Sequence, residues 1–305
     1  MKSAVIMRNR LIFGVLFCGC LAAGCGKQEK EFPGTDSPVI KVSLQIVPQA
    51  TRAQMDPISG ATTFVEGDNV SVWSKGLVKD IDARYFKVGP DYALTSSNEY
   101  KYNGKQGASF FACYPPKSGS GTVGFAVKAN QSEEGALAAS DFMTSSVSVE
   151  DASEQAVSLP FTHRLSLLGI RLADIENVKD VVLKNAKTKV SWEMEGDVLR
   201  TEDSEISDIT LGRNARVAGE EYLAIVPAQV LKGNDVAVVI RLDNGNELTW
   251  TPESDLTLES SQLIQITLSQ THGGADALVA LSVLSAEWGK VESVEGMLVD
   301  EEDPM

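Results

Sequence analysis

The sequence predicts an all-β protein built from β-sandwiches, and three features lead to this fold class. Apolar and polar residues alternate with a period of two in several segments. Clusters of Pro, Gly, Asn and Ser separate these segments at short intervals. Only residues 133–143 could form a helical turn or two. Many short strands without long helices are typical of sandwiches, in which two sheets bury their apolar faces against each other.

The first 24 residues resemble a secretory signal peptide. Three bases and no acid precede the apolar run LIFGVLFCGCLAA, which is shorter than the roughly 20 residues that cross a bilayer. The run ends in LAAGC, which resembles a bacterial lipobox and predicts lipidation of Cys25 as the first mature residue. Leu21 lies one position further from Cys25 than is usual, so Cys20 is an alternative, as is an ordinary signal peptide without lipid. Cleavage at Cys20 would leave LAAG on the mature chain.

Composition limits the partners and the source of stability. Removal of residues 1–24 leaves 281 of the 305 residues, which suits two medium domains, and takes the net charge from −15 to −18. An acidic surface repels phosphate backbones, so nucleic acid is not an expected partner. Beyond Cys25 only Cys113 remains, so the mature chain has no intramolecular disulfide and must be stabilised by hydrophobic cores.

Four segments predict strands. Alternation over 39–47, ended by Pro48, and again over 190–194 and 264–268, indicates strands with one buried face. Residues 222–227 (YLAIVP) are apolar on both faces, as in a central strand.

A hairpin with a three-residue loop is predicted around residues 236–250. A two-residue loop would turn Leu248 and Trp250 to the wrong face. The loop Asp243–Asn244–Gly245 instead pairs Ile240 with Leu248. Parity of the side chains therefore selects three residues, with Gly245 in the left-handed conformation.

The stretch LPFTHRLSLLGIRL, residues 159–172, raises two questions. Its apolar phase changes at Leu167–Leu168, near Gly169, which predicts a β-bulge or, alternatively, burial on both faces. It also contains His163, one of only two histidines in the chain. A histidine at the start of a strand usually satisfies a backbone group, so we expect His163 to be structural.

Catalytic signals are weak, and no catalytic residue, metal site or cofactor is predicted. GSGTVG, residues 119–124, matches a dinucleotide fingerprint in letters, but no strand precedes it and no helix follows, so we expect a hairpin loop. The acidic runs 201–208 and 300–303 lack the spacing of a calcium loop. Cys113, among aromatic residues, is predicted to be a small core residue.

Several motifs, taken in order, resemble the fimbrillin family of Bacteroidales, the Mfa-like surface proteins. The resemblance covers most of the mature chain up to about residue 270. In the motif over residues 130–143, Asn130 replaces the Asp that is more usual in the family. The motifs are LAAGC, ATRAQ around Arg52, FVEGDNVSVW (64–73), FFACYPP (110–116), NQSEEGALAASDFM (130–143) and LPFTHRLSLL (159–168).

The resemblance implies two transthyretin-like β-sandwich domains in tandem after a lipoprotein signal peptide. The expected division is a signal peptide over 1–24, an N-terminal domain over 25–153, a C-terminal domain over 154–270, and a C-terminal strand and acidic tail over 271–305. It further implies a structural or accessory subunit of fimbriae at the outer membrane surface, not an enzyme, with other fimbrial subunits as partners.

The family's assembly gives Arg52 and Ala53 an expected role. An Arg-specific surface protease would cut between them and remove the lipid together with the strand 39–47. A strand from another subunit would then fill the groove by β-augmentation. The alternative is that Arg52 is an ordinary exposed loop arginine. The donor could be residues 277–288, with Ala277, Val279, Leu281 and Val283 on one apolar face, or this segment could be the last strand of its own domain.

Two other functions remain open from the sequence. A monomeric outer-membrane lipoprotein that binds glycans would need an exposed, coplanar pair among Trp73, Trp192, Trp250 and Trp288. A glycosidase would need two carboxylates about 5–10 Å apart in a cleft.

Overall fold

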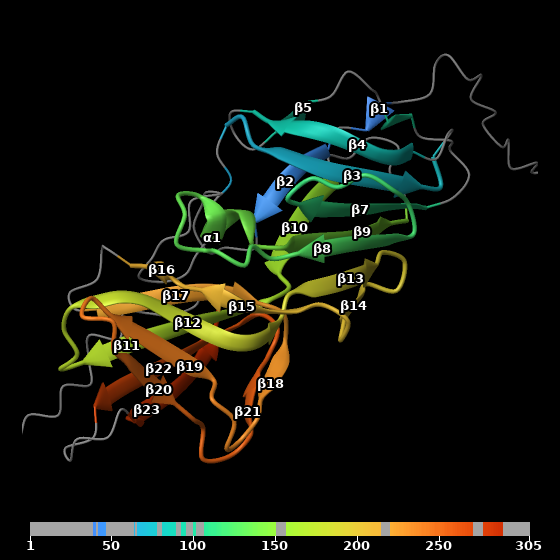
Figure 1. Ribbon diagram of the computed structural model, residues 1–305. Helices are drawn as coiled ribbons and strands as arrows, with labels where there is room; N and C mark the ends of the chain where they lie inside the picture. The colour runs from blue at the N-terminus through green and yellow to red at the C-terminus, as the bar shows by residue number, and fades with distance from the viewer. Residues whose placement is uncertain are drawn as a thin grey trace, which may run out of the picture. The chain divides into compact units, whose positions relative to one another are not determined.

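Strands make up nearly all of the secondary structure in the computed structural model (Figure 1), which confirms the predicted all-β class. Among the described residues the only helix is α1 (Ala136–Ala139), within the segment predicted to form a helical turn. All described residues belong to one unit, Phe32–Met305. The structure describes residues 39–40, 42–46, 64, 66–77, 81–89, 93–95, 100–101, 107–150, 157–214, 220–270 and 277–288.

The first half of the chain forms a seven-stranded sheet in the order β2-β10-β9-β7-β3-β4-β5. Its strands are β2 (Val42–Ile46), β3 (Asn69–Lys75), β4 (Ile81–Val88), β5 (Leu94–Thr95), β7 (Ala108–Tyr114), β9 (Met143–Val149) and β10 (Val157–His163). β2 runs parallel to β10, and the other neighbours are antiparallel. β1 (Val39–Ile40) pairs separately with β6 (Tyr100–Lys101). The predicted strand 39–47 is therefore confirmed as β1 and β2.

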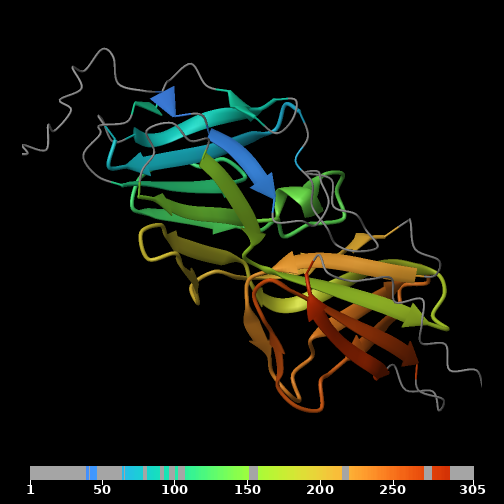
Figure 2. The ribbon, with the colours of Figure 1, turned by 180° about the vertical axis from the view of Figure 1, so that it is seen from behind.

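Two further sheets form a sandwich in the second half. The five-stranded sheet has the order β16-β17-β11-β22-β23, and the four-stranded sheet has the order β15-β12-β19-β20. Both contribute buried side chains to one hydrophobic cluster. Figure 2 shows β22 and β23 side by side at one edge. The strands are β11 (Ser166–Ala173), β12 (Val178–Lys187), β15 (Ile206–Thr210), β16 (Gly212–Arg213), β17 (Glu220–Val226), β19 (Val238–Leu242), β20 (Glu247–Trp250), β22 (Gln262–Gln270) and β23 (Leu278–Glu287).

Two small sheets complete the described elements. β8 (Thr122–Ala126) pairs with β13 (Lys189–Glu193), which also pairs with β14 (Val198–Thr201). β18 (Gln229–Leu231) pairs with β21 (Leu256–Leu258). The predicted strands at 190–194 and 264–268 are confirmed as β13 and β22, and the doubly apolar segment 222–227 lies in β17, between β16 and β11.

Two strands of the seven-stranded sheet, β3 and β7, are buried on both faces because their side chains alternate between two clusters. Val70 and Val72 of β3 join the smaller cluster with Phe110 of β7. Trp73 of the same strand joins the larger cluster, where its ring meets the edge of Trp192 on β13 at a centroid distance of 6.2 Å. The larger cluster thus includes residues from both predicted domains, and the division at residues 153 and 154 stays a prediction.

The predicted hairpin is confirmed in its register and its loop. Ile240 lies opposite Leu248, and Val238 lies opposite Trp250. The Leu242 N–H donates to the Asn246 carbonyl at 2.9 Å, which closes a loop of three residues. Gly245 has φ +88°, the conformation that glycine adopts without a steric cost.

The predicted β-bulge near Gly169 is wrong, and the alternative of burial on both faces is confirmed. β11 pairs with β17 over 166–172 and with β22 over 167–173 without a register shift. Leu167 and Leu168 point to opposite faces, and both are buried. The change of apolar phase therefore reflects a central strand with two covered faces.

Candidate functional site

Lipidation and processing were predicted at Cys25, Arg52 and Ala53, and these three residues lie outside the described part of the chain. What the structure describes is the strand on the N-terminal side of Arg52, β2, and the elements that contact it. Two edge strands are of interest for strand exchange: β2 near the start of the described residues and β23 near their end.

β2 is the terminal strand of the seven-stranded sheet, and it completes the pairing of β10. The parallel register runs from Val42 opposite Val157 to Ile46 opposite Phe161. On its other side β10 pairs with β9 only at Thr162 and His163. β2 is therefore the described strand that pairs with residues 157–161, whose Val157, Leu159 and Phe161 side chains are buried in the smaller cluster. Loss of β2 would expose a strand edge next to apolar side chains.

β23 is the terminal strand of the five-stranded sheet and pairs antiparallel with β22, from Leu278 opposite Gln270 to Glu287 opposite Gln262. Segment 277–288 thus lies in its own sheet, as one of the two interpretations predicted. A register shift leaves Leu281 without a partner in the ladder, because Ala280 lies opposite Leu268 and Ser282 lies opposite Thr267. The predicted single apolar face is wrong, since the shift puts Val279 and Val283 on opposite faces.

Much of β23 is exposed even though it is apolar. Its four large exposed side chains, Val279, Leu281, Val283 and Leu284, keep between 42% and 60% of their surface accessible. A long edge strand with exposed apolar side chains is a template for pairing with another chain. The two strands 278–287 and 42–46 are therefore the described candidates for exchange.

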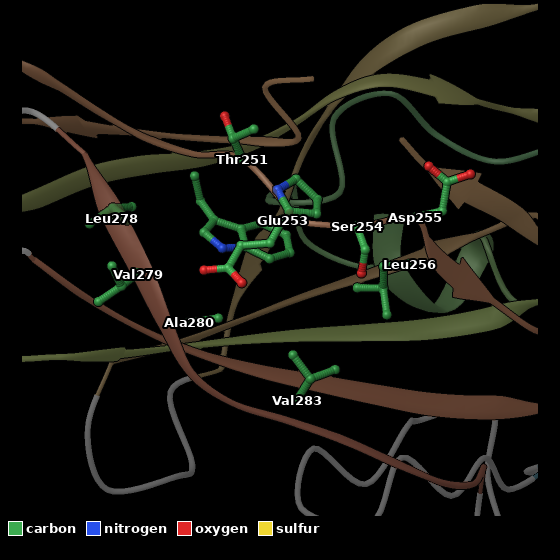
Figure 3. A pocket seen from close by; sticks show the side chains of 11 residues that line it. Thr251, Glu253, Ser254, Asp255, Leu256, Leu278, Val279, Ala280 and Val283 are labelled. Atoms are coloured by element: carbon green, nitrogen blue, oxygen red, sulfur yellow. The ribbon is translucent and has the colours of Figure 1, made fainter. Parts of the chain in front are cut away.

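A pocket of about 330 Å³ lies beside β23 (Figure 3). Side chains from residues 251–256 lie across from those of β23, and the lining combines apolar residues such as Leu256 and Val283 with the acids Glu253 and Asp255. Asp255 bonds to the Lys232 Nζ at 2.7 Å, and this ammonium is the main reason that the pKa of Asp255 is lowered. The lining holds the hydroxyls of Thr251 and Ser254 but no histidine, cysteine or lysine, so no side chain that ordinarily titrates near neutral pH stands beside these hydroxyls as a base.

His163 forms part of a partly buried cluster that joins the end of β10 to the residue after β23. Its Nδ1 lies 2.9 Å from the Asp141 Oδ1, and its ring stacks on Trp288 with centroids 4.0 Å apart and planes 10° apart. The Ser261 hydroxyl donates to the His163 carbonyl, not to the imidazole. No nucleophile–base pair is formed by these groups, so the geometry supports the predicted structural role. At Nδ1 the partner is the Asp141 carboxylate and not a backbone group.

Cys113 and the four tryptophans are all buried. The Cys113 thiol lies 3.5 Å from the Pro115 carbonyl, and burial raises the pKa of this thiol to about 12. The prediction that Cys113 is a core residue is confirmed. The exposed indole pair that a glycan-binding surface would need is not formed by Trp73, Trp192, Trp250 and Trp288.

The remaining motifs form neither a cofactor cradle nor a membrane span. In GSGTVG, Gly119 and Gly121 have positive φ, and strand β8 follows them directly instead of a helix. The predicted hairpin loop is wrong, because β8 pairs with β13 and the preceding strand β7 pairs with β3 and β9. No three histidine, cysteine or acidic side chains gather into a metal site within the ranges given above. Over the same ranges, no helix is both long and apolar enough to cross a bilayer.

Comparison with known proteins identifies a family and solved structures to which this chain is similar. The fimbrillin-like family matches residues 44–288. A candidate cell adhesion protein of Bacteroides uniformis has a TM-score of 0.62 at 13% identity, covering 83% of this chain and 99% of that one. A second, from Bacteroides ovatus, has a TM-score of 0.58 at 12% identity, with coverage of 83% and 98%. A third, from Bacteroides thetaiotaomicron, has a TM-score of 0.51 at 16% identity, with coverage of 78% and 95%.

At these identities the solved structures show that the fold is shared. No curated protein matches the chain. The family match, in contrast, extends from β2 to the end of β23 and covers well over half of the sequence. The chain therefore belongs to the fimbrillin-like family.

Proposed function

We propose that this chain is a structural or accessory subunit of cell-surface fimbriae, exported as a lipoprotein to the outer membrane. The observation that carries the proposal is the fimbrillin-like match over residues 44–288. The described pocket contains no histidine, and in the His163 cluster the Ser261 hydroxyl bonds to a carbonyl and not to the imidazole, which favours a structural role over an enzymatic one. Other fimbrial subunits are the proposed partners, and no cofactor is required.

The proposed maturation has two covalent steps. Cys25 receives the lipid that anchors the chain. An Arg-specific surface protease then cuts between Arg52 and Ala53, so that the lipid and residues 25–52 leave together. We assign the two cores of the proposed subunit to an N-terminal domain over 25–153 and a C-terminal domain over 154–270, with 271–305 as a strand and tail.

The pairing of β10 supports a strand-exchange step after the cut. Removal of β2 would take away the described partner of residues 157–161 and leave the buried Leu159 next to an open edge. An incoming strand with alternating apolar residues would restore the main-chain hydrogen bonds and cover this edge. A strand of another subunit, supplied from the segment that forms β23 here, has the required length and apolarity.

Treatment of the purified chain with an Arg-specific protease tests the proposal. The cleaved chain should form polymers that are visible by electron microscopy and size-exclusion chromatography. Arg52→Ala should stay monomeric, whereas Arg200→Ala, which removes an exposed arginine on β14, should polymerise like the parent. Complete cleavage after Arg52 without polymer, or equal polymer formation by Arg52→Ala, would contradict the strand-exchange proposal.

A further inference from the structure

Trp288 anchors the C-terminal end of β23, in contrast to the exposed middle of that strand. Its side chain is 3% exposed, and the indole stacks flat on His163 at 4.0 Å. Its backbone N–H donates to the Ser261 carbonyl at 2.9 Å. One residue beyond the end of the β22–β23 ladder, the chain is therefore held by both its side chain and its backbone.

The surface that receives Trp288 is fixed by partners from distant segments. Asp141, which follows α1 and whose side chain is 1% exposed, holds the His163 Nδ1 at 2.9 Å. Ser261 has φ +63°, its N–H donates to the Leu165 carbonyl at 2.7 Å, and its hydroxyl donates to the His163 carbonyl. The His163 ring and the Ser261 carbonyl that Trp288 contacts are thus held in place by partners other than Trp288.

The rest of β23 has few contacts of this kind. In the strand itself only Leu278 is buried, at the opposite end. Leu281 interrupts the ladder, and Val283 and Leu284 are exposed on opposite faces. β23 therefore depends on its backbone pairing with β22, on two side-chain hydrogen bonds to that strand, from Ser282 to Thr267 at 3.1 Å and from Ser285 to Gln262 at 2.6 Å, and on two buried side chains, of which Trp288 is the larger.

We propose that Trp288, with His163, Asp141 and Ser261, is a latch that decides whether β23 stays on β22 or detaches as a free strand. With the latch closed, β23 covers the edge of β22. When Trp288 leaves His163, the exposed middle of β23 cannot hold the strand, and β23 opens as a unit. The use of the released strand in assembly rests on the proposed fimbrial function, whereas the latch itself is a property of the isolated chain.

Hydrogen–deuterium exchange on the full-length monomer tests the latch without protease or polymer. Trp288→Ala should speed exchange of the β23 amides at least tenfold while β11 and β17 stay within twofold of the parent. Trp288→Phe, which keeps a ring on His163, should restore β23 to within threefold. Leu284→Ala, which truncates an exposed side chain on the same strand, should leave exchange unchanged.

Three outcomes would overturn the proposal. Equal acceleration in β11, β17 and β23 would show that Trp288 is only a core residue, and unchanged exchange in β23 would show that the ladder alone holds the strand. His163→Ala provides a second route if Trp288→Ala does not fold. It should speed exchange of the β23 amides as Trp288→Ala does. The double variant should exchange no more than twofold faster than either single variant, because both substitutions remove the same contact. Additive effects of the two substitutions would also overturn the latch.

If fimbrial polymerisation fails in the protease experiment while the exchange results hold, the proposed function falls and the latch stands. If polymerisation succeeds and exchange in β23 is unchanged by Trp288→Ala, the proposed function stands and the latch falls.

Discussion

At the scale of single residues, Cys113 and Tyr114 show how burial sets chemistry in this protein. They are neighbours on β7, and desolvation is the main reason that the pKa of each is raised to about 12. A thiol becomes a nucleophile only as the thiolate. Cys113 is therefore protected both by burial and by its protonated state.

The Cys113 thiol should not react with iodoacetamide at pH 8 in the folded protein. A chain that starts at Gly26 contains no other cysteine, so labelling reports on this position alone. Labelling should become complete when the same chain is unfolded in guanidinium. Labelling of the folded chain at a rate near that of the unfolded chain would contradict the burial of Cys113.

Stability should fall as the pH rises from about 9 towards 12. The ordinary pKa of cysteine is 9.0, so the unfolded chain releases the Cys113 proton in this range while the folded chain keeps it. The unfolded state then binds fewer protons, and this group alone lowers the free energy of unfolding by about 1.4 kcal/mol per pH unit. Urea midpoints at pH 8, 9, 10 and 11 measure the slope, which should be smaller in Cys113→Ser; equal slopes in both chains would count against this assignment.

Gly245→Val should destabilise the sandwich that contains β19 and β20 by roughly 1 kcal/mol or more, because a β-branched residue at φ +88° is strained. Gly124→Val is the matched control, since Gly124 lies in β8 without positive φ and with open space where a Cβ would stand. Thermal unfolding should show a lower midpoint for the first variant only. An equal midpoint for both would argue against a strained loop.

At the scale of elements, the sequence predicts strands better than their partners. Period-two alternation in the sequence predicts β2, β13 and β22, and the structure shows that β13 and β22 each bury one face. The alternation of side chains also fixes the length of the β19–β20 loop. The pairing of β8 with β13 joins residues about 65 apart, and nothing local encodes it. The bulge in β23 is also invisible, since an exposed Leu281 breaks no apolar pattern.

The same limit applies to the candidate site. His163 could be identified as structural from its place at a strand start, but its partners Asp141 and Trp288 lie 22 and 125 residues away. Their approach depends on how β10, β22 and β23 are ordered in space. The contacts of His163 with these distant residues therefore could not be predicted from the periodicity of the sequence.

Truncation after Gly274 should leave a folded monomer that no longer polymerises after cleavage at Arg52. It removes β23 with the buried side chains of Leu278 and Trp288, so the free energy of unfolding should drop by several kcal/mol, roughly the sum expected for two large core deletions. Truncation after Trp288 keeps β23 and is the control. Circular dichroism and chromatography distinguish the outcomes: an unfolded product would make β23 part of an indispensable core, and normal polymers would place the donor strand elsewhere.

At the scale of the whole molecule, one hydrophobic cluster connects the two halves of the described chain. Trp73 and Phe111 of the first half and Trp192 of the second belong to it, and the exposed ion pair between Lys75 and Glu195 adds a polar contact between the same halves. Exposed ion pairs contribute little, so the apolar contact holds these segments together. The net charge of −15 favours solubility. The acidic polypeptide itself supplies no attachment to a membrane, so the proposed attachment needs a lipid.

The proposed attachment is a lipid on Cys25, and Cys25→Ala should therefore release the protein from the membrane fraction. An acyl chain on a mature N-terminal cysteine supplies apolar burial of about 0.8 kcal/mol per methylene, which the acidic polypeptide does not replace. Labelled fatty acid should be incorporated into the parent and into Cys20→Ala, but not into Cys25→Ala. Acylation of Cys25→Ala together with loss of label in Cys20→Ala would move the lipid to Cys20, and absence of label in the parent would leave an ordinary signal peptide.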